Sequence, residues 1–155
     1  MRHLTNRKDI AFILTISWMV LIFYLSHQPA STSSKLSGSF VQVLFEIVSL
    51  FPIVIEGDTV HFIVRKSAHF MAYFILGILI MHTVRLFSRL SIFSIVNGFF
   101  ITVLYAASDE FHQTFIPGRS GEIRDVLIDS AGSLTGILTY VVAVLLYNNR
   151  RQTSK

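Results

Sequence analysis

The chain carries four long runs of apolar residues separated by shorter polar stretches. The runs cover residues 10–25, 67–86, 92–107 and 126–147. A helix needs about 20 apolar residues to cross the roughly 30 Å hydrocarbon core of a bilayer. We therefore expect an all-α polytopic membrane protein, in which these runs form a four-helix transmembrane bundle. Residues 1–155 are expected to form a single domain, because chains of about this length are usually one domain.

Two stretches between the runs refine this picture. The second and third runs are separated only by residues 85–89, so we expect their helices to form a tight antiparallel hairpin. Residues 36–55 are apolar enough for a fifth span, but they contain Gln42, Glu46 and Pro52. A charged side chain inside a span costs about 2.5–3.5 kcal/mol on insertion scales. We therefore predict an extra amphipathic helix at the outer face for residues 36–55.

The composition agrees with a membrane protein and excludes several other classes. Only 14% of the residues are charged and 52% are hydrophobic, whereas about 25% are charged in soluble domains. The sequence has no cysteine, which excludes disulfides and thiolate metal sites. Its net charge of +4 comes with no basic stripe along a helix, which argues against nucleic-acid binding.

The basic residues predict the orientation in the membrane. One side of the bundle receives Arg2, Arg7, Lys8, Arg85, Arg89, Arg150, Arg151 and Lys155, with Asp9 as its only acid. The other side has nearly all the acidic residues. Because cytoplasmic loops are enriched in Lys and Arg, we expect a multi-pass protein of the bacterial cytoplasmic membrane with both termini cytoplasmic.

Most of the remaining ionisable residues gather at the predicted outer ends of the last three runs. The candidate site residues are Lys66, His69, Tyr73, Asp109, Glu110, His112, Gln113, Arg119, Asp125 and Asp129. Residues three or four apart share one face of a helix, and this spacing relates Lys66, His69 and Tyr73. Ionisable groups at membrane depth are a functional hypothesis by default. We therefore predict a polar site there, rather than a purely structural network.

The residue types suggest roles within this site. Lys66 and Arg119 suit binding of an anionic group. His112, oriented by Asp109 or Glu110, is the candidate for general acid–base catalysis. Asp125 and Asp129 are expected to hold the cations and His69 in place, with Gln113 and Tyr73 as further ligand-binding groups.

The sequence contains no recognisable metal or nucleophile motif. Histidine and carboxylates can bind a divalent metal, but no His-Glu-x-x-His or other compact ligand motif is present. Gly118-Arg119-Ser120-Gly121 lacks the strand–turn–helix context of a serine nucleophile. We expect neither a metal nor another cofactor.

A stripe of small and acidic residues follows one face of the last run. Asp125, Asp129, Gly132 and Gly136 are spaced by four, three and four residues. Gly-x-x-x-Gly allows close approach of a neighbouring helix. This neighbour could be another helix of the chain or the same helix of a homodimer.

These motifs together resemble the VanZ-like family of small bacterial membrane proteins, which is named for a teicoplanin-resistance protein. The matching pieces are residues 23–29, 65–70 with Tyr73 and Leu76-Gly77, 108–113 with Phe115, 117–119, 124–126, Asp129 and Gly132. The resemblance implies the bacterial cytoplasmic membrane and a link to glycopeptide or lipoglycopeptide tolerance, but it implies no reaction. Ala72 departs from the family pattern, in which a Glu precedes the Tyr.

Two functions of different classes stay open at this point. In the first, the outer-face site recognises an anionic lipid or cell-envelope headgroup, with or without modifying it. In the second, the protein is a non-enzymatic accessory or binding protein whose polar cluster is structural. A transporter is less favoured, because the sequence shows no inverted repeat and no helix break at mid-membrane depth.

Overall fold

The computed structural model describes residues 7–29 and 57–153. Within these residues the fold is all-α, with helices α1 (Arg7–Ser26), α3 (Gly57–Phe87), α4 (Ile92–Gln113) and α5 (Ile123–Thr153). All four are long and apolar enough to cross a membrane. The predicted four spans are therefore confirmed. The amphipathic helix predicted for residues 36–55 lies outside the described residues, and no fifth helix appears among those that are described.

The helices extend beyond the apolar runs that predicted them. Helix α4 continues to Gln113 instead of ending near residue 107, and α3 begins at Gly57, ahead of its apolar run. The added turns carry Lys66, Asp109 and Glu110, which are buried. The helices continue because these polar side chains find partners inside the bundle, as described below.

The short link between α3 and α4 reverses the chain as predicted. Helix α4 starts with a capping box, in which the Ser91 side chain accepts a hydrogen bond from the Ser94 backbone and Ser94 accepts one from the Ser91 backbone. Such a box satisfies backbone donors that the first helical turn leaves free. The capping box therefore stabilises the start of α4 through local contacts.

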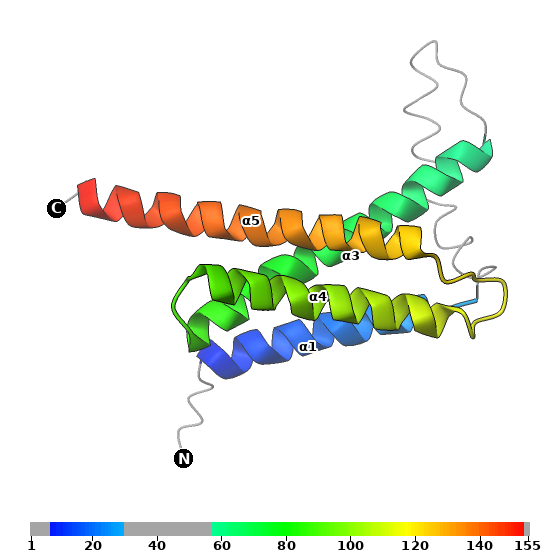
Figure 1. The fold of residues 1–155 in the computed structure, drawn as a ribbon, viewed down its shortest axis with the longest axis horizontal. Coiled ribbons are helices and arrows are strands. Elements are labelled where there is room, and N and C mark those ends of the chain that lie inside the picture. Colours follow the sequence, from blue (N-terminus) through cyan, green and yellow to red (C-terminus); the bar gives the residue numbers. More distant parts are fainter. Residues whose placement is uncertain (1–6, 30–56, 154–155) are drawn as a thin grey trace, which may run out of the picture.

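The four helices bring the polar residues to one end of the bundle (Figure 1). Helices α1 and α4 end there and α5 begins there, while α1 begins and α5 ends toward the opposite end. We call this the polar end, defined by Ser26, Gln113 and Ile123. The start of α1 and the end of α5 on one side fit an even number of spans. Their cytoplasmic location stays a prediction.

Helix α3 packs closely against α5 through glycines. Gly132 faces the backbone carbonyl of Phe70, and Gly136 faces that of Phe74. A Cβ at either glycine would collide with the carbonyl oxygen, so only glycine allows this approach. The stripe for which the sequence also suggested a homodimer is thus covered by α3 of the same chain.

The surface and the interior have the polarity expected in lipid rather than in water. Large apolar side chains such as Phe93, Phe100 and Leu127 are exposed. The buried set includes Asp125 and Asp129, which have no exposed surface. Charged residues are almost never fully buried in soluble proteins unless they are paired. The bundle therefore has an apolar outside for lipid and a polar interior at one end.

Candidate functional site

The structure places all ten candidate residues at the polar end of the bundle. The buried ones are Lys66, Tyr73, Asp109, Glu110, Gln113, Asp125 and Asp129, and the partly exposed ones are His69, His112 and Arg119. They come from α3, α4, α5 and the loop between α4 and α5. Their contacts divide them into a group whose polar atoms are paired and a smaller group whose atoms are not.

Lys66 belongs to the paired group. Its Nζ donates a short hydrogen bond to Asp125 Oδ1 and lies 3.5 Å from Glu122 Oε2. Arg65 Nη2 lies 3.6 Å from the second oxygen of Asp125. The expected contact of Asp125 with Lys66 is present, and it ties α3 to the start of α5. The ammonium group of Lys66 is therefore already neutralised by the protein.

Arg119 also uses its guanidinium for contacts within the chain. Nε donates to the backbone carbonyl of Gln28 at 2.9 Å, and Nη2 donates to that of Leu25 at 3.2 Å. Nη1 donates to Gln113 Oε1 at 3.1 Å. Burial and, after it, the charge of Arg65 lower the pKa of Arg119 from its ordinary value. The side chain joins the loop before α5 to the end of α1.

Gln113 connects the two carboxylates of the last turns of α4. Its Nε2 lies 3.1 Å from Glu110 Oε1 and 3.4 Å from Asp109 Oδ2. Because the amide oxygen accepts from Arg119, both ends of this fully buried side chain are used. Asp109 Oδ2 also accepts a hydrogen bond of 2.9 Å from Ser26 Oγ of α1.

The predicted pair of Asp109 and His112 is not formed. His112 Nε2 lies instead 3.0 Å from His27 Nδ1, and its ring is stacked with that of His27 and tilted against that of Phe23 in α1. Asp109 points into the bundle toward Ser26. Sequence reasoning missed Ser26 and His27 as site residues. Both lie in the segment 23–29 that carried the family resemblance, which was the available signal.

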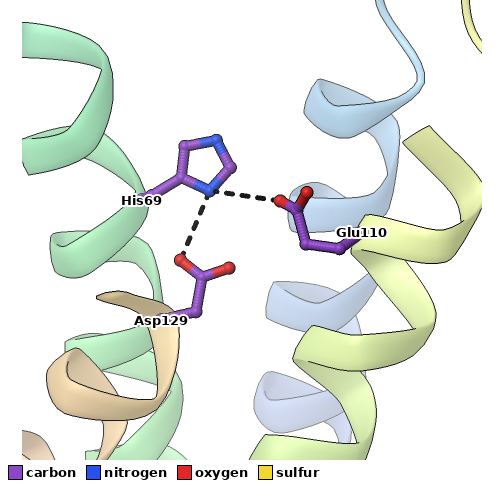
Figure 2. Close-up of side chains that lie close together, drawn as sticks. All are labelled: His69, Glu110 and Asp129. Atoms are coloured by element: carbon purple, nitrogen blue, oxygen red, sulfur yellow. Dashed lines mark ion pairs between the residues drawn. The ribbon is translucent and has the colours of Figure 1, made fainter. Parts of the chain in front are cut away.

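The remaining candidates form a centre where α3, α4 and α5 meet. His69 Nδ1 lies 3.3 Å from Asp129 Oδ1 and 4.0 Å from Glu110 Oε1 (Figure 2). We call the imidazole and these two carboxylates the His69 centre. The second ring nitrogen, Nε2, lies on the side of the ring away from both carboxylates. The His69 side chain is 15% exposed, whereas those of Glu110 and Asp129 are 4% and 0% exposed, so His69 is the most accessible member of the centre.

Glu110 is held in this centre by the loop before α5. Its Oε2 accepts a hydrogen bond of 3.0 Å from the Glu122 backbone N–H. The preceding Gly121 lies against the backbone carbonyl of Glu110, where a Cβ would collide with it. A glycine at this position therefore lets the loop approach α4 closely enough for the Glu122 amide to reach the carboxylate.

Several buried polar atoms around the centre have no hydrogen-bond partner among the described residues. They include Tyr73 Oη, Asp109 Oδ1 and Asp129 Oδ2. Buried polar groups are nearly always hydrogen-bonded, and exceptions often mark an additional water or ion. The effective penalty for burying an ion is several kcal/mol. The acidic side chains near His69 therefore carry more negative charge than the neighbouring basic side chains can balance.

The His69 centre is also the place where a metal could be held. One nitrogen of His69 and one oxygen each of Glu110 and Asp129 lie within 4.8 Å of one another. The sequence led us to expect no metal, because the three residues are far apart in the chain and form no spacing motif. An imidazole whose Nδ1 is oriented by a carboxylate can bind a ligand or transfer a proton through its other nitrogen.

Fold and site together define a multi-pass membrane protein with a buried His–carboxylate centre at one end of its helical bundle. The family model described as VanZ/LLP1 matches residues 11–146. The chain therefore belongs to the VanZ/LLP1 family, as its motifs indicated, and the match includes every candidate site residue. No curated protein and no solved structure matches the chain.

Proposed function

We propose that this VanZ/LLP1-family membrane protein recognises an anionic lipid or cell-envelope headgroup at the polar end of its bundle, with His69 as the contacting side chain. The observation that carries the proposal is the setting of His69. Asp129 lies 3.3 Å from Nδ1, while Nε2 faces away from both carboxylates (Figure 2). A carboxylate at one nitrogen fixes the orientation of an imidazole. The other nitrogen then donates a hydrogen bond to an anionic headgroup.

This assignment gives the ligand contact to His69 among the candidate residues, in place of Lys66 and Arg119. Lys66 is neutralised by Asp125, and Arg119 donates to two backbone carbonyls and to Gln113. Arginine is a strong anion binder only when its planar group of donors is free to meet the anion. In this chain Lys66 and Arg119 hold the helix ends in place.

The cellular role that we propose follows from the headgroup site and the family resemblance. A membrane protein that binds an envelope headgroup can change the response to glycopeptide or lipoglycopeptide antibiotics, which act at the cell envelope. The expected result is that expression of the wild-type chain raises the inhibitory concentration of teicoplanin and that His69→Gln does not. If cells with equal amounts of the wild-type chain and of His69→Gln had the same inhibitory concentration, a role of this site in antibiotic tolerance would be contradicted.

The direct test of headgroup recognition is mass spectrometry of lipids that stay bound to the protein. The purified wild-type chain is incubated with a bacterial lipid extract, purified again and compared with His69→Gln. His112→Gln is the matched control, because it makes the same change at a partly exposed histidine of the same end. We expect anionic lipids on the wild type and on His112→Gln, and much less on His69→Gln.

The same experiment separates binding from catalysis. A lipid species converted by the wild type but not by His69→Gln would make the protein an enzyme and identify its substrate class. Retained but unchanged lipid would make it a binding protein. Equal lipid retention by the wild type and the folded His69→Gln variant would contradict a headgroup site at His69.

A second candidate is a non-enzymatic accessory protein in which the polar cluster is structural. The observation in its favour is that Arg119 and Ser26 join the end of α1 to the rest of the bundle. In that case His69→Gln would lower the thermal unfolding midpoint and the cellular function to the same degree. The unpartnered oxygens of Asp109 and Asp129 weigh against it, because a purely structural network gains nothing from unsatisfied buried groups.

A further inference from the structure

We propose that His69, Glu110 and Asp129 together bind one divalent metal ion of the kind that accepts mixed nitrogen and oxygen ligands, such as Mn²⁺ or Zn²⁺. The inference rests on the proposed function, because it assigns a cofactor to the same centre. Each of the three helices α3, α4 and α5 contributes one ligand. The site therefore exists only in the assembled bundle.

The distances in the centre suit coordination of a single ion. Bonds of about 2.0–2.2 Å from zinc to nitrogen and oxygen place two neighbouring ligand atoms roughly 3–4 Å apart. Nδ1 of His69 lies 3.3 Å from Asp129 Oδ1 and 4.0 Å from Glu110 Oε1. Figure 2 shows both carboxylates on the same side of the imidazole ring, which faces them with Nδ1. An ion among the three needs only small side-chain movements.

Independent support comes from side chains outside the ligand set. Tyr73 lies one turn from His69 on α3, and its hydroxyl is buried and without a hydrogen-bond partner among the described residues. The charged groups that act on it include Asp109, Asp129 and Glu110. Asp109 Oδ1 is likewise buried and unpartnered. Such groups commonly orient the ligands and waters of a metal ion from the outer shell.

The charges around the centre also favour a cation. Asp109, Glu110 and Asp129 are buried with one histidine. The nearby cations of α3, Arg65 and Lys66, are paired with Asp125 and Glu122. A divalent ion balances the remaining carboxylates, and carboxylate and imidazole are the ligands that Mn²⁺ and Zn²⁺ accept.

The ion also supplies what the headgroup site lacks. Lys66 and Arg119 are occupied by contacts within the chain, so neither provides free positive charge for an anion. A metal with three protein ligands keeps at least one position open for another ligand. A phosphate or carboxylate oxygen of a headgroup would occupy that position.

The test uses the full-length chain in detergent, stripped with a chelator and titrated with Mn²⁺ alone. Electron paramagnetic resonance of free Mn²⁺ then gives the number of ions bound and their affinity. We expect one ion per chain, with affinity reduced at least tenfold in Asp129→Asn and in Glu110→Gln. Glu122→Gln is the matched control, since this carboxylate lies at the same end outside the ligand set, and we expect less than a twofold change.

The test does not depend on the folding of a single variant, because two different ligands are replaced. If Asp129→Asn does not fold, Glu110→Gln gives the same comparison, because its amide oxygen still accepts from the Glu122 backbone N–H. Absence of saturable Mn²⁺ binding by the wild type would overturn the inference. An equal loss of affinity in Glu122→Gln and the ligand variants would overturn it as well, because the ion would then bind a general acidic surface.

Lipid retention with and without chelator distinguishes failure of this inference from failure of the proposed function. Bound Mn²⁺ without retained anionic lipid would remove the headgroup proposal and leave the metal site. Retained lipid in a chain that binds no Mn²⁺ would remove the metal site and leave the headgroup proposal. Lipid that is released when the chelator removes the ion would support both.

Discussion

The guanidinium of Arg119 donates a 2.9 Å hydrogen bond from Nε to the backbone carbonyl of Gln28, which lies 91 residues earlier in the chain. A second nitrogen reaches the Leu25 carbonyl at 3.2 Å. Carbonyls at a helix end lack partners within the helix, so Arg119 satisfies the end of α1. Arg119, which the sequence suggested as an anion ligand together with Lys66, thus joins the α4–α5 loop to the end of α1.

Replacing Arg119 tests this assignment. Arg119→Lys keeps the charge but loses the forked donors, and hydrogen bonds to charged groups contribute about 1.5–3 kcal/mol each. We expect a thermal unfolding midpoint several degrees below that of the wild type, while lipid retention per folded molecule stays unchanged. Arg124→Lys is the control, because Arg124 is exposed and contacts only the Phe62 ring in the described residues. Normal stability with lost lipid retention would make Arg119 a ligand after all.

The glycine contact between α3 and α5 gives a second prediction. A Cβ in Gly132→Ala would collide with the Phe70 carbonyl oxygen, and overpacking of this kind costs about 1–3 kcal/mol. We expect a lower unfolding midpoint in a detergent thermal scan. In Gly98→Ala the new Cβ meets only Ile80 Cγ2 at 3.6 Å and Met81 at 3.8 Å. Gly98→Ala should therefore have the unfolding midpoint of the wild type. Equal midpoints for Gly132→Ala and Gly98→Ala would contradict the close approach of α3 and α5 at Gly132.

Ser26 provides a third prediction at the end of α1. Its hydroxyl donates a hydrogen bond of 2.9 Å to the buried Asp109 carboxylate. Losing a hydrogen bond to a charged group costs about 1.5–3 kcal/mol. Ser26→Ala should therefore destabilise the bundle. Ser108→Ala removes a hydroxyl that is exposed and bonds within its own helix, so its unfolding should match the wild type. An equal, small effect of both changes would mean that Asp109 does not depend on α1.

The ion pair of Lys66 and Asp125 gives a fourth prediction. Removing one partner of a buried pair costs about 3–5 kcal/mol, because the other charge stays buried, whereas replacing both with apolar residues is often neutral. We expect Lys66→Met and Asp125→Leu each to destabilise strongly. The double variant should be more stable than either single variant when all are unfolded under the same conditions. Additive losses in this cycle would show that the two side chains are not coupled.

The number and order of the spans could be predicted from sequence because hydrophobic runs reflect the lipid around them. Helix ends could not be predicted from those runs. Asp109, Glu110 and Gln113 look like the start of a polar loop, yet they continue α4 because each has a partner inside the bundle. A local pattern does not contain this information, since Ser26 and Glu122 belong to other segments of the chain.

The location of the site was predictable, and its pairings were predictable only in part. Depth along each run places His69, Asp109 and Asp129 at the same end. Which side chains meet depends on how each helix is rotated, and this rotation is set by contacts such as Gly132 against Phe70. The sequence expected Asp129 to hold His69, and the structure places the two side by side. It paired His112 with Asp109 or Glu110, whereas the structure places His112 beside His27.

The polar contacts of α1 have a consequence for how the chain is inserted during synthesis. Thr15 meets Thr83, Trp18 donates to the Ala72 carbonyl, and Ser26 meets Asp109, partners that lie 68, 54 and 83 residues later. At ribosomal speeds of about 5–20 residues per second, these partners emerge roughly 3–17 s after α1. Helix α1 therefore enters the membrane well before its hydrogen-bond partners are synthesised, and until then it is a single span without these contacts.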